Sequence, residues 1–319
     1  MNYYLGIDLG GTRIKIGLST DNKLIEIQNV KARRDLCFQY NMKVIVEVAV
    51  HMCIENEISQ YDITSIGFGF PGLVNSKTKK VIATNEKYND VIDFNWDLWA
   101  KENFGASIYL ENDARMACIG EWKIGAGKPY TDFILITLGT GIGTAVVMDN
   151  RLLVGKHYQA GNLGGHFSIN YDGRLCTCGN RGCVEAEASS DVLKELVVNH
   201  SEFKNSLLAD VEDINFNCIF QFAEKDKVAL DVRNHCMDVW SAAIISYIHA
   251  FDLEAVILVG GIMNSKEVIL PYIKEKVYNM AWTPWGKVKI LCGELNNSAG
   301  VNGAILMAKE QEQNENIQY

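Results

Sequence analysis

The sequence contains one short pattern twice, an apolar strand, a glycine-rich turn and a second apolar strand. The first copy occupies residues 3–18 and the second occupies residues 133–148. With Asp8 laid on Thr137, the first glycines of the two turns coincide, and an Asp-Asn pair follows each second strand, one residue out of register. This repeat predicts two β-hairpins in two related halves of the chain.

The remaining sequence alternates between strand-like and helix-like segments, which is typical of an α/β fold. We expect strands at residues 63–70 and 106–110 and a last one at 255–259, and helices at 94–104, 114–122, across much of 191–251 and at 298–310. The expected domains are residues 1–121, completed by the C-terminal helix within 298–319, and residues 122–297. Because no Pro/Gly/Ser-rich linker separates them, we expect a shared interface with a cleft.

The composition limits the classes of partner. The 319 residues are 48% hydrophobic, which suffices for two cores, and the net charge is −9 without a basic run, which argues against nucleic acid. No window approaches the roughly 18 uncharged apolar residues of a membrane span, and no signal-peptide pattern precedes the first strand. Nine cysteines, an odd number, are typical of a reducing compartment. We therefore expect a cytoplasmic protein that binds neither nucleic acid nor membrane.

One histidine and three cysteines within eighteen residues form a second strong pattern: His166, Cys176, Cys178 and Cys183. This is the ligand set of a closed tetrahedral zinc site, which leaves no position for a catalytic water. Disulfide pairing and unrelated buried thiols are the alternatives, although a Cys-x-Cys spacing is awkward for a bridge. We predict a structural zinc ion that fixes residues 161–185, a loop that also presents Asn162 and Glu185.

The two glycine turns suit an anion, since residues without Cβ let backbone N–H groups approach phosphate oxygens and a threonine hydroxyl adds a donor. Either turn alone could be an ordinary hairpin turn. Two copies in related halves favour a nucleoside triphosphate held between them. Neither turn has the Walker pattern, and neither has the dinucleotide pattern, because a strand follows instead of a helix.

Asp113 lies between an expected strand and an expected helix. It could cap the helix N-terminus, or it could accept a proton from a substrate hydroxyl at the carboxyl end of the strand. Asn112 could cap while Asp113 acts as the base. Gly260 and Gly261, after the strand at 255–259, could turn the chain or let it pass close to a nucleotide.

In order along nearly the whole chain, these motifs resemble those of the ROK family (repressors, open reading frames, sugar kinases). The matching residues are Asp8-x-Gly-Gly-Thr12, Pro71-Gly72-x-Val74, Glu111-Asn112-Asp113, Leu138-Gly-Thr-Gly-Ile-Gly143, Gly165-His166, Cys176-x-Cys178-Gly-x-x-Gly-Cys183-x-Glu185 and Val259-Gly-Gly261. The resemblance implies a two-domain fold of the actin and hexokinase type, which is ribonuclease H-like, and phosphorylation of a free hexose by Mg²⁺-ATP. It also implies a homo-oligomer, with a dimer as the expected assembly.

The resemblance assigns roles by position. Asp113 resembles the family's catalytic base, and His166 resembles a histidine that binds zinc through one ring nitrogen and faces the sugar with the other. The implied sugar contacts are Gly72, Asn85, Asn112, Asp113, Asn162, His166 and Glu185. The implied ATP and Mg²⁺ contacts are Asp8, Gly10, Gly11, Thr12, Thr140, Gly141, Gly260 and Gly261.

The loop before His166 departs from the family pattern. The family usually has Gly-Glu-(Ile/Leu)-Gly-His, whereas this chain has Asn162 in place of the glutamate and one added glycine. An amide can accept one hydrogen bond and donate another, which suits a sugar with a carbonyl or an epimer of glucose. Alternatively, the added glycine swings Asn162 away and widens the pocket.

A sugar-responsive regulator is the alternative function. The family's repressors carry a helix-turn-helix domain before the kinase-like core, whereas only seven residues precede Asp8 here. A sugar sensor without catalysis is a further alternative, against which Asp113 and the two glycine turns argue. We expect a kinase whose sugar is glucose or a related or N-acetylated hexose.

Overall fold

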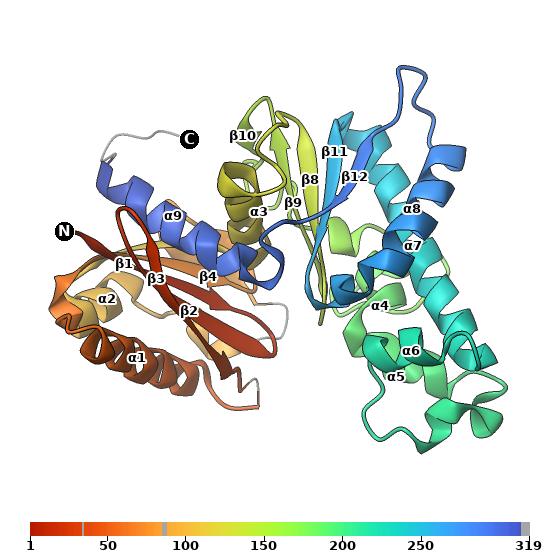
Figure 1. Ribbon diagram of the computed structural model, residues 1–319, viewed down its shortest axis with the longest axis horizontal. Helices are drawn as coiled ribbons and strands as arrows, with labels where there is room; N and C mark the ends of the chain where they lie inside the picture. The colour runs from red at the N-terminus through yellow and green to blue at the C-terminus, as the bar shows by residue number, and fades with distance from the viewer. Residues whose placement is uncertain (34, 85–87, 314–319) are drawn as a thin grey trace. The chain divides into compact units, whose positions relative to one another are not determined.

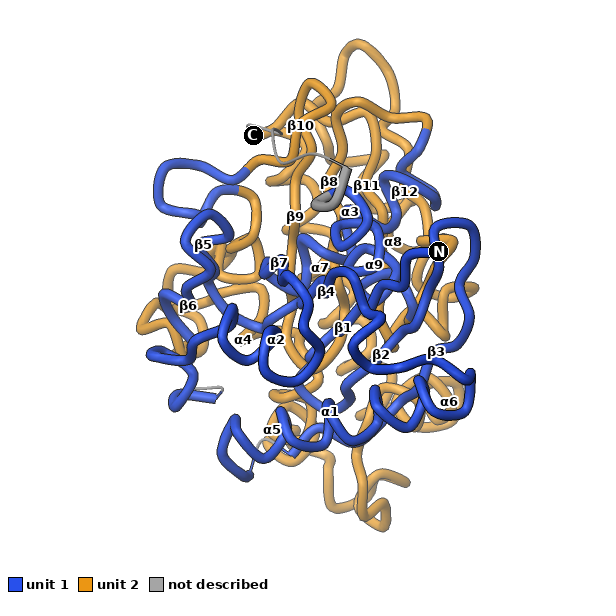
Figure 2. Tube along the Cα trace, turned by 90° about the vertical axis from the view of Figure 1, so that its left-hand side faces the viewer, with its two compact units in different colours: residues 1–128, 154–160, 298–319 blue, residues 129–153, 161–297 orange. Residues whose placement is uncertain are grey.

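The computed structural model describes residues 1–33, 35–84 and 88–313. The chain divides into two compact units, shown in Figure 2. Unit 1 contains Met1–Lys128, Val154–Ala160 and Ser298–Tyr319, and unit 2 contains Pro129–Leu153 and Gly161–Asn297. A division after residue 121 would cut helix α3 (Asp113–Ile124), and the units divide after Lys128 instead.

Each unit contains a five-stranded sheet in the described part of the chain, and the two sheets share one strand order. The orders are β3-β2-β1-β4-β7 in unit 1 and β10-β9-β8-β11-β12 in unit 2. In both, the hairpin and its outer neighbour are antiparallel, and the other two strands are parallel to the first strand of the hairpin. This confirms the two related halves predicted from the repeat. The strands are β1 (Tyr3–Leu9), β2 (Arg13–Thr20), β3 (Leu24–Lys31), β4 (Ile63–Phe70), β7 (Ser107–Asn112), β8 (Phe133–Leu138), β9 (Ile142–Met148), β10 (Arg151–Leu152), β11 (Ala255–Val259) and β12 (Lys289–Cys292).

In unit 1, helices cover both faces of the sheet (Figure 1). Helices α1 (Phe38–Glu55) and α2 (Trp96–Phe104) share one apolar core with the sheet residues Leu5 and Ile7. Gly6, between those two residues, points to the other face, where α9 (Ala299–Gln313) packs. A Cβ on Gly67 would lie 1.9 Å from the carbonyl oxygen of Ala304, so only glycine lets this helix approach so closely. A two-stranded sheet, β5 (Leu73–Asn75) with β6 (Lys80–Ala83), follows β4.

In unit 2, the helices build a core on the face of the sheet that carries Ile134 and Ile136. They are α4 (Val184–Ala188), α5 (Ser190–Val198), α6 (Phe216–Phe222), α7 (Lys227–Phe251) and α8 (Lys266–Met280). The expectation that residues 255–259 form the last strand is wrong, because α8 and then β12 follow β11. Among the described residues, no helix has the length and the apolar composition that a membrane crossing requires.

Candidate functional site

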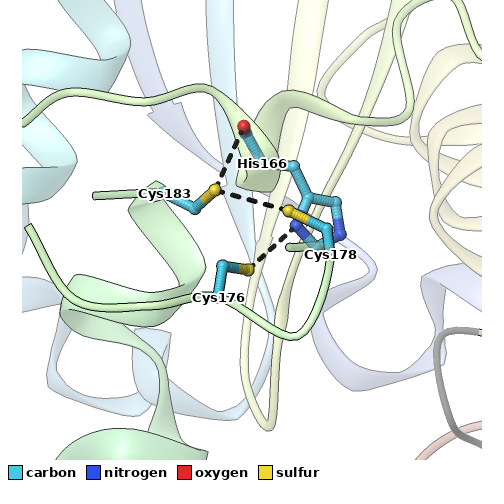
Figure 3. A group of neighbouring side chains, drawn as sticks. All are labelled: His166, Cys176, Cys178 and Cys183. Carbon is cyan, nitrogen blue, oxygen red and sulfur yellow. Dashed lines mark hydrogen bonds between the residues drawn. The ribbon is translucent and has the colours of Figure 1, made fainter. Parts of the chain in front are cut away.

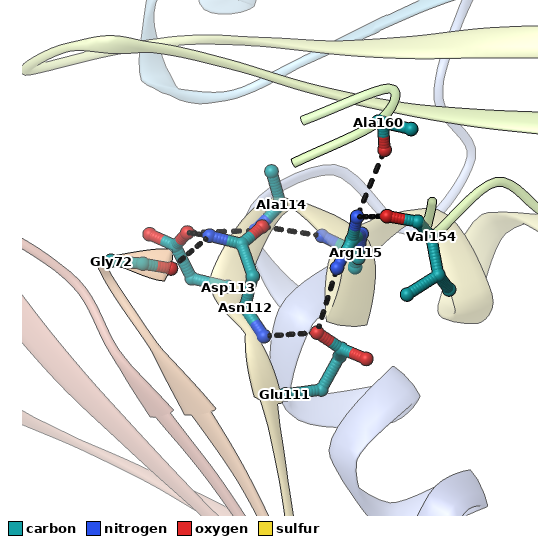
Figure 4. A network of polar contacts seen from close by, with 8 residues as sticks. All are labelled: Gly72, Glu111, Asn112, Asp113, Ala114, Arg115, Val154 and Ala160. Atoms are coloured by element: carbon teal, nitrogen blue, oxygen red, sulfur yellow. Dashed lines mark hydrogen bonds and ion pairs between the residues drawn. The ribbon is translucent and has the colours of Figure 1, made fainter. Parts of the chain in front are cut away.

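The end of β7 and the start of α3 carry Asn112 and Asp113 (Figure 4). Asn112 is the N-cap of α3: its Oδ1 accepts the backbone N–H of Arg115 at 3.1 Å. Its Nδ2 donates to the carbonyl of Gly72 and to Oδ1 of Asp113, each at 3.0 Å. The same Asp113 oxygen accepts the N–H of Ala114 at 2.8 Å. The expectation that Asn112 could cap is confirmed, so the cap does not require Asp113.

The structure contains a buried ion pair next to Asp113 that was not predicted from the sequence. Glu111 and Arg115 are almost fully buried, and their Oε1 and Nη1 atoms lie 3.3 Å apart. Burial raises the pKa of Glu111, and the adjacent Arg115 guanidinium opposes that rise. Arg115 Nη2 also donates to the carbonyls of Val154 at 3.2 Å and Ala160 at 2.9 Å. The sequence feature that could have predicted this ion pair is the pair of opposite charges, four residues apart, at a strand–helix junction.

The glycine turn of unit 1 closes through a hydrogen bond from Gly10 N–H to the carbonyl of Arg13 at 2.9 Å. Asp8, 8% exposed, lies at the end of β1, and its Oδ2 is 3.0 Å from the Nζ atom of Lys15, its cross-strand partner. A Cβ on Gly300, in the first turn of α9, would lie 2.6 Å from this carboxyl group. Asp8 therefore combines a lysine partner with the positive end of a helix dipole. Lys15 was missed, although the hairpin register placed it opposite Asp8.

The glycine turn of unit 2 is held by groups behind it. Gly139 N–H donates to the carbonyl of Gly141 at 3.1 Å, and the N–H groups of Ser190 and Asp191, at the start of α5, donate to the carbonyls of Gly139 and Thr140. Glu185, from α4, accepts the N–H of Ile142 at 2.8 Å. These contacts fix the turn in one conformation.

The residues predicted from three parts of unit 2 gather around this turn. A Cβ on Gly141 would lie 2.3 Å from Oε2 of Glu185, so the turn and the predicted sugar ligand are in contact. Gly260, with φ +103°, lies against the carbonyl of Leu138, which brings the end of β11 to the same edge. A Cβ on the adjacent Gly261 would meet no described atom within 4 Å. The carboxyl ends of β8 and β11 therefore form one edge bordered by glycine, where α/β proteins bind ligands.

The loop that carries Asn162 is fixed on both sides. Thr144 Oγ1, from β9, donates to the carbonyl of Gly161 and accepts the N–H of Gly164, each at 2.8 Å. A Cβ on Gly165 would lie 1.9 Å from the carbonyl oxygen of Ile142, so the added glycine allows the loop to lie against β9. Asn162 is 8% exposed, and its Oδ1 has no hydrogen-bond partner among the described residues. This buried acceptor is therefore open to a hydrogen bond from a ligand or an ordered water.

His166 and the three cysteines converge as Figure 3 shows, with their ligand atoms all within 4.8 Å of one another. His166 Nδ1 lies 3.4 Å from Sγ of Cys176, and Sγ of Cys178 lies 3.6 Å from Sγ of Cys183. Zinc bonds of about 2.0 Å to nitrogen and 2.3 Å to sulfur place tetrahedral ligands about 3.5 to 3.8 Å apart. These two distances and the donor set fit zinc, whereas a disulfide requires sulfur atoms about 2.05 Å apart.

The electrostatics of the cluster also favour a cation. Burial raises the pKa values of Cys176 and Cys183, and neighbouring thiols raise that of Cys183 further. The pKa of Cys178 is lowered instead, because hydrogen bonds from the Asn180 backbone and from the other two thiols outweigh its burial. Three adjacent thiols therefore resist joint ionisation unless a positive ion lies among them.

The structure places the predicted residues in two groups, one in each unit. Unit 1 carries Asp8, Gly10, Gly11, Thr12, Gly72, Asn112 and Asp113, and unit 2 carries Thr140, Gly141, Asn162, His166, Cys176, Cys178, Cys183, Glu185, Gly260 and Gly261. Asn85 lies outside the described residues.

Comparison with known proteins gives matches over almost the whole chain. The ROK family model matches residues 4–311. The glucokinase of Thermotoga maritima is 29% identical over 315 residues, which cover 96% of this chain and 97% of that protein. The xylose repressor of Bacillus subtilis is 26% identical over 306 residues, which cover 95% of this chain and 75% of the repressor.

A ROK family glucokinase from Streptomyces griseus, whose crystal structure contains glucose and AMPPNP, has the same fold. It superposes with a TM-score of 0.79 at 26% identity, covering 97% of this chain and 100% of that one. The similarity confirms the predicted α/β fold of the actin and hexokinase type. The motifs, the duplicated sheet and the family match agree, and the chain belongs to the ROK family.

Proposed function

We propose that this protein is an ATP-dependent kinase of a free hexose, with Asp113 as the general base. The observation that carries the proposal is that Asn112, and not Asp113, caps α3. The Asn112 side chain accepts the N-cap hydrogen bond from the backbone N–H of Arg115, so the cap does not require the Asp113 carboxylate. A carboxylate at the carboxyl end of a strand, next to a residue that already caps the helix, suits proton transfer. The relatives named glucokinase support the same reaction class.

In the proposed reaction, Asp113 takes the proton from one sugar hydroxyl as that oxygen attacks the γ-phosphate of ATP. The N–H groups of Gly10 and Gly139 close the two turns, and the turn residues Gly11, Thr12, Thr140 and Gly141 would offer their backbone N–H groups to the triphosphate. Asp8 would provide a carboxylate for the metal. Mg²⁺, when bound with ATP, neutralises phosphate charge, and one carboxylate suffices because Mg²⁺ usually keeps phosphate oxygens and waters as its other ligands.

We propose that the sugar contacts on unit 1 are Gly72, Asn85, Asn112 and Asp113. Those on unit 2 are Asn162, His166 and Glu185. In His166, Nδ1 faces Cys176 and Nε2 is the nitrogen left for the sugar. The contacts on the nucleotide are Gly10, Gly11, Thr12, Thr140, Gly141, Gly260 and Gly261.

We propose that zinc fills the site formed by His166, Cys176, Cys178 and Cys183 and is structural. All four protein ligands are used, so the ion has no position for a reacting water. Its effect is to hold the loop that carries Asn162 and His166 and the start of α4, which carries Glu185. By family resemblance, we also propose that the protein is a cytoplasmic homodimer, and sedimentation measurements test the oligomeric state.

Asn162 is the residue that we expect to select the sugar. Its buried Oδ1 lacks a described partner, and its 8% exposure does not support a side chain swung out into solvent. The acceptor suits a sugar hydroxyl or an acetamido N–H, and the amide N–H₂ suits a carbonyl. We therefore propose glucose or a related or N-acetylated hexose as the substrate class.

A sugar-responsive regulator is the second candidate, favoured by the similarity to the xylose repressor. A coupled assay of ATP consumption with glucose, mannose, fructose, allose, N-acetylglucosamine and N-acetylmannosamine separates the two. We expect saturable turnover with at least one hexose. Sugar binding without ATP consumption would support the regulator and reject the kinase.

A further inference from the structure

The Arg115 guanidinium contacts both ends of one short segment, Val154–Ala160. Figure 4 shows its hydrogen bonds to the carbonyl oxygens of Val154, at 3.2 Å, and Ala160, at 2.9 Å. Both bonds are partly buried, and a planar guanidinium can serve two acceptors and a carboxylate at once. Arg115 has no exposed side-chain surface. Its position is therefore fixed by packing as well as by these bonds.

The segment is itself a closed loop. The N–H of Ala160 donates to the carbonyl of Val154 at 3.1 Å, so its ends meet beside Arg115. Gly155 has φ +73°, and a Cβ there would lie 2.7 Å from Cβ of Ala160, so the closure requires glycine. Arg115 therefore holds the two ends of the loop at one point.

The residues on both sides of this contact lie close in sequence to residues of the proposed reaction. Arg115 is two residues after Asp113, in the first turn of the same helix, and its backbone N–H is the one that Asn112 caps. Ala160 is two residues before Asn162, whose loop is then fixed at Gly161 by Thr144. One side chain thus connects the helix of the proposed base to the chain that enters the proposed sugar loop.

We infer that Arg115 is a positioning residue for sugar recognition, an inference that rests on the proposed kinase function. It acts through the backbone of residues 160–162, and it sets the affinity for the hexose more than the rate of phosphoryl transfer. The competing account is that Arg115 only neutralises the buried Glu111. The two accounts differ in whether the carbonyl contacts or the charge is required.

The variant Arg115→Lys distinguishes the positioning account from the charge-neutralisation account. Lysine keeps the positive charge beside Glu111 but lacks the planar fork that reaches both carbonyls. We expect the KM and Kd of the best hexose in the panel to rise roughly tenfold, the loss of one hydrogen bond from a charged group. We expect the KM of ATP, the zinc content and kcat to change little. An unchanged affinity for the hexose, with only a lower Tm, would overturn the inference.

Glu111→Gln is the matched control, because it removes the ion pair and leaves both carbonyl contacts of Arg115. We expect a change in stability with an unchanged sugar KM. If Glu111→Gln raised that KM as much as Arg115→Lys, the charge would be the requirement and the inference would fail.

Gly155→Ala tests the same segment without touching a buried charge, and it serves if Arg115→Lys does not fold. The added Cβ strains the closed loop, so we expect a weaker hexose affinity with normal zinc content. An unchanged hexose affinity in folded Gly155→Ala protein would also contradict the inference. If the wild-type protein turns over a hexose, the proposed kinase function stands even when the variants contradict the Arg115 inference. Wild-type protein that neither binds nor phosphorylates any hexose overturns both the kinase function and the Arg115 inference.

Discussion

The glycine turns of the two units belong to the same kind of hairpin, but different charged and polar groups surround them. In unit 1, Asp8 lies beside the turn with Lys15 opposite it and the first turn of α9 against its carboxyl group. In unit 2, the aligned residue is Thr137, opposite Gly143, and its hydroxyl has no described hydrogen-bond partner. The hairpin is a common scaffold, and the groups around it decide which charge each unit offers.

The difference extends to how the loops are held. Unit 1 positions Asp113 with short contacts at one strand–helix junction, through Asn112 and Ala114. Unit 2 positions Asn162 on a long loop that depends on Thr144 and on the metal cluster, and it positions Glu185 at the start of α4, which begins directly after Cys183. We therefore expect a change at Asp113 to act mainly on turnover, and changes in the unit 2 loop to act on metal content and sugar choice.

The largest expected effect is that of Asp113→Asn. Turnover should fall by roughly 10²- to 10⁴-fold, the usual contribution of a general base, while the fold and hexose binding persist. Asparagine would satisfy a purely capping role, so near-normal turnover would show that Asp113 is not the base. Steady-state kinetics with calorimetric hexose binding provide both values.

Cys178→Ser should have the next largest effect, with zinc lost and activity reduced by at least about 100-fold. Purified wild-type protein should contain about one zinc per chain. Metal analysis across a pH series should show release on acidification, because the ligands must be thiolates. Cys37→Ser, at an exposed cysteine outside the cluster, is the control and should keep both zinc and activity. Zinc-free protein with full activity would contradict the structural-metal hypothesis.

A matched pair of variants tests the comparison of the two turns directly. Asp8→Asn should lower kcat/KM for ATP by about 10- to 100-fold, the value of a charge-assisted contact. Thr137→Val should leave kcat/KM unchanged and leave the free energy of unfolding equal or about 1 kcal/mol higher, since it removes a buried hydroxyl without a described partner. Equal losses in both variants would show that the two turns are not specialised as we describe.

Asn162→Ala should produce the smallest effect on the total rate and a clear effect on selectivity. Its loss removes one or two hydrogen bonds, so the preference between the best and the second-best hexose should fall about tenfold. The comparison requires kcat/KM for each sugar in the panel. A selectivity identical to that of the wild type, with glucose far above every other sugar, would remove Asn162 from the specificity determinants.

Strong local patterns predicted much of this molecule. The alternation in residues 3–18 and 133–148 predicted both hairpins, and the apolar run at 255–259 predicted β11 at its observed bounds. The histidine and cysteine spacing predicted a cluster that the fold indeed brings together. In each case the signal is local, because turn geometry and side-chain alternation depend on neighbouring residues.

Other features depend on tertiary packing, which spacing does not reveal. The short strand β12 has the sequence Lys-Ile-Leu-Cys and is specified by pairing with β11, and no separate segment was assigned to α1 or α8. The role of Arg115 depends on carbonyls at residues 154 and 160, which are remote in sequence. The reason for the glycine before His166 became visible only when the carbonyl of Ile142 was placed against it.

Transfer of an isotopic label from ATP to the sugar tests the central claim most directly. Wild-type protein and Asp113→Asn are incubated with each hexose and with ATP carrying ¹⁸O in its γ-phosphate. The products are separated, and mass spectrometry measures the ¹⁸O content of the hexose phosphate and of inorganic phosphate. The account predicts labelled hexose phosphate with the wild type and at least about 100-fold less with the variant. Label found only in inorganic phosphate, or no consumption of ATP with any hexose, would contradict it.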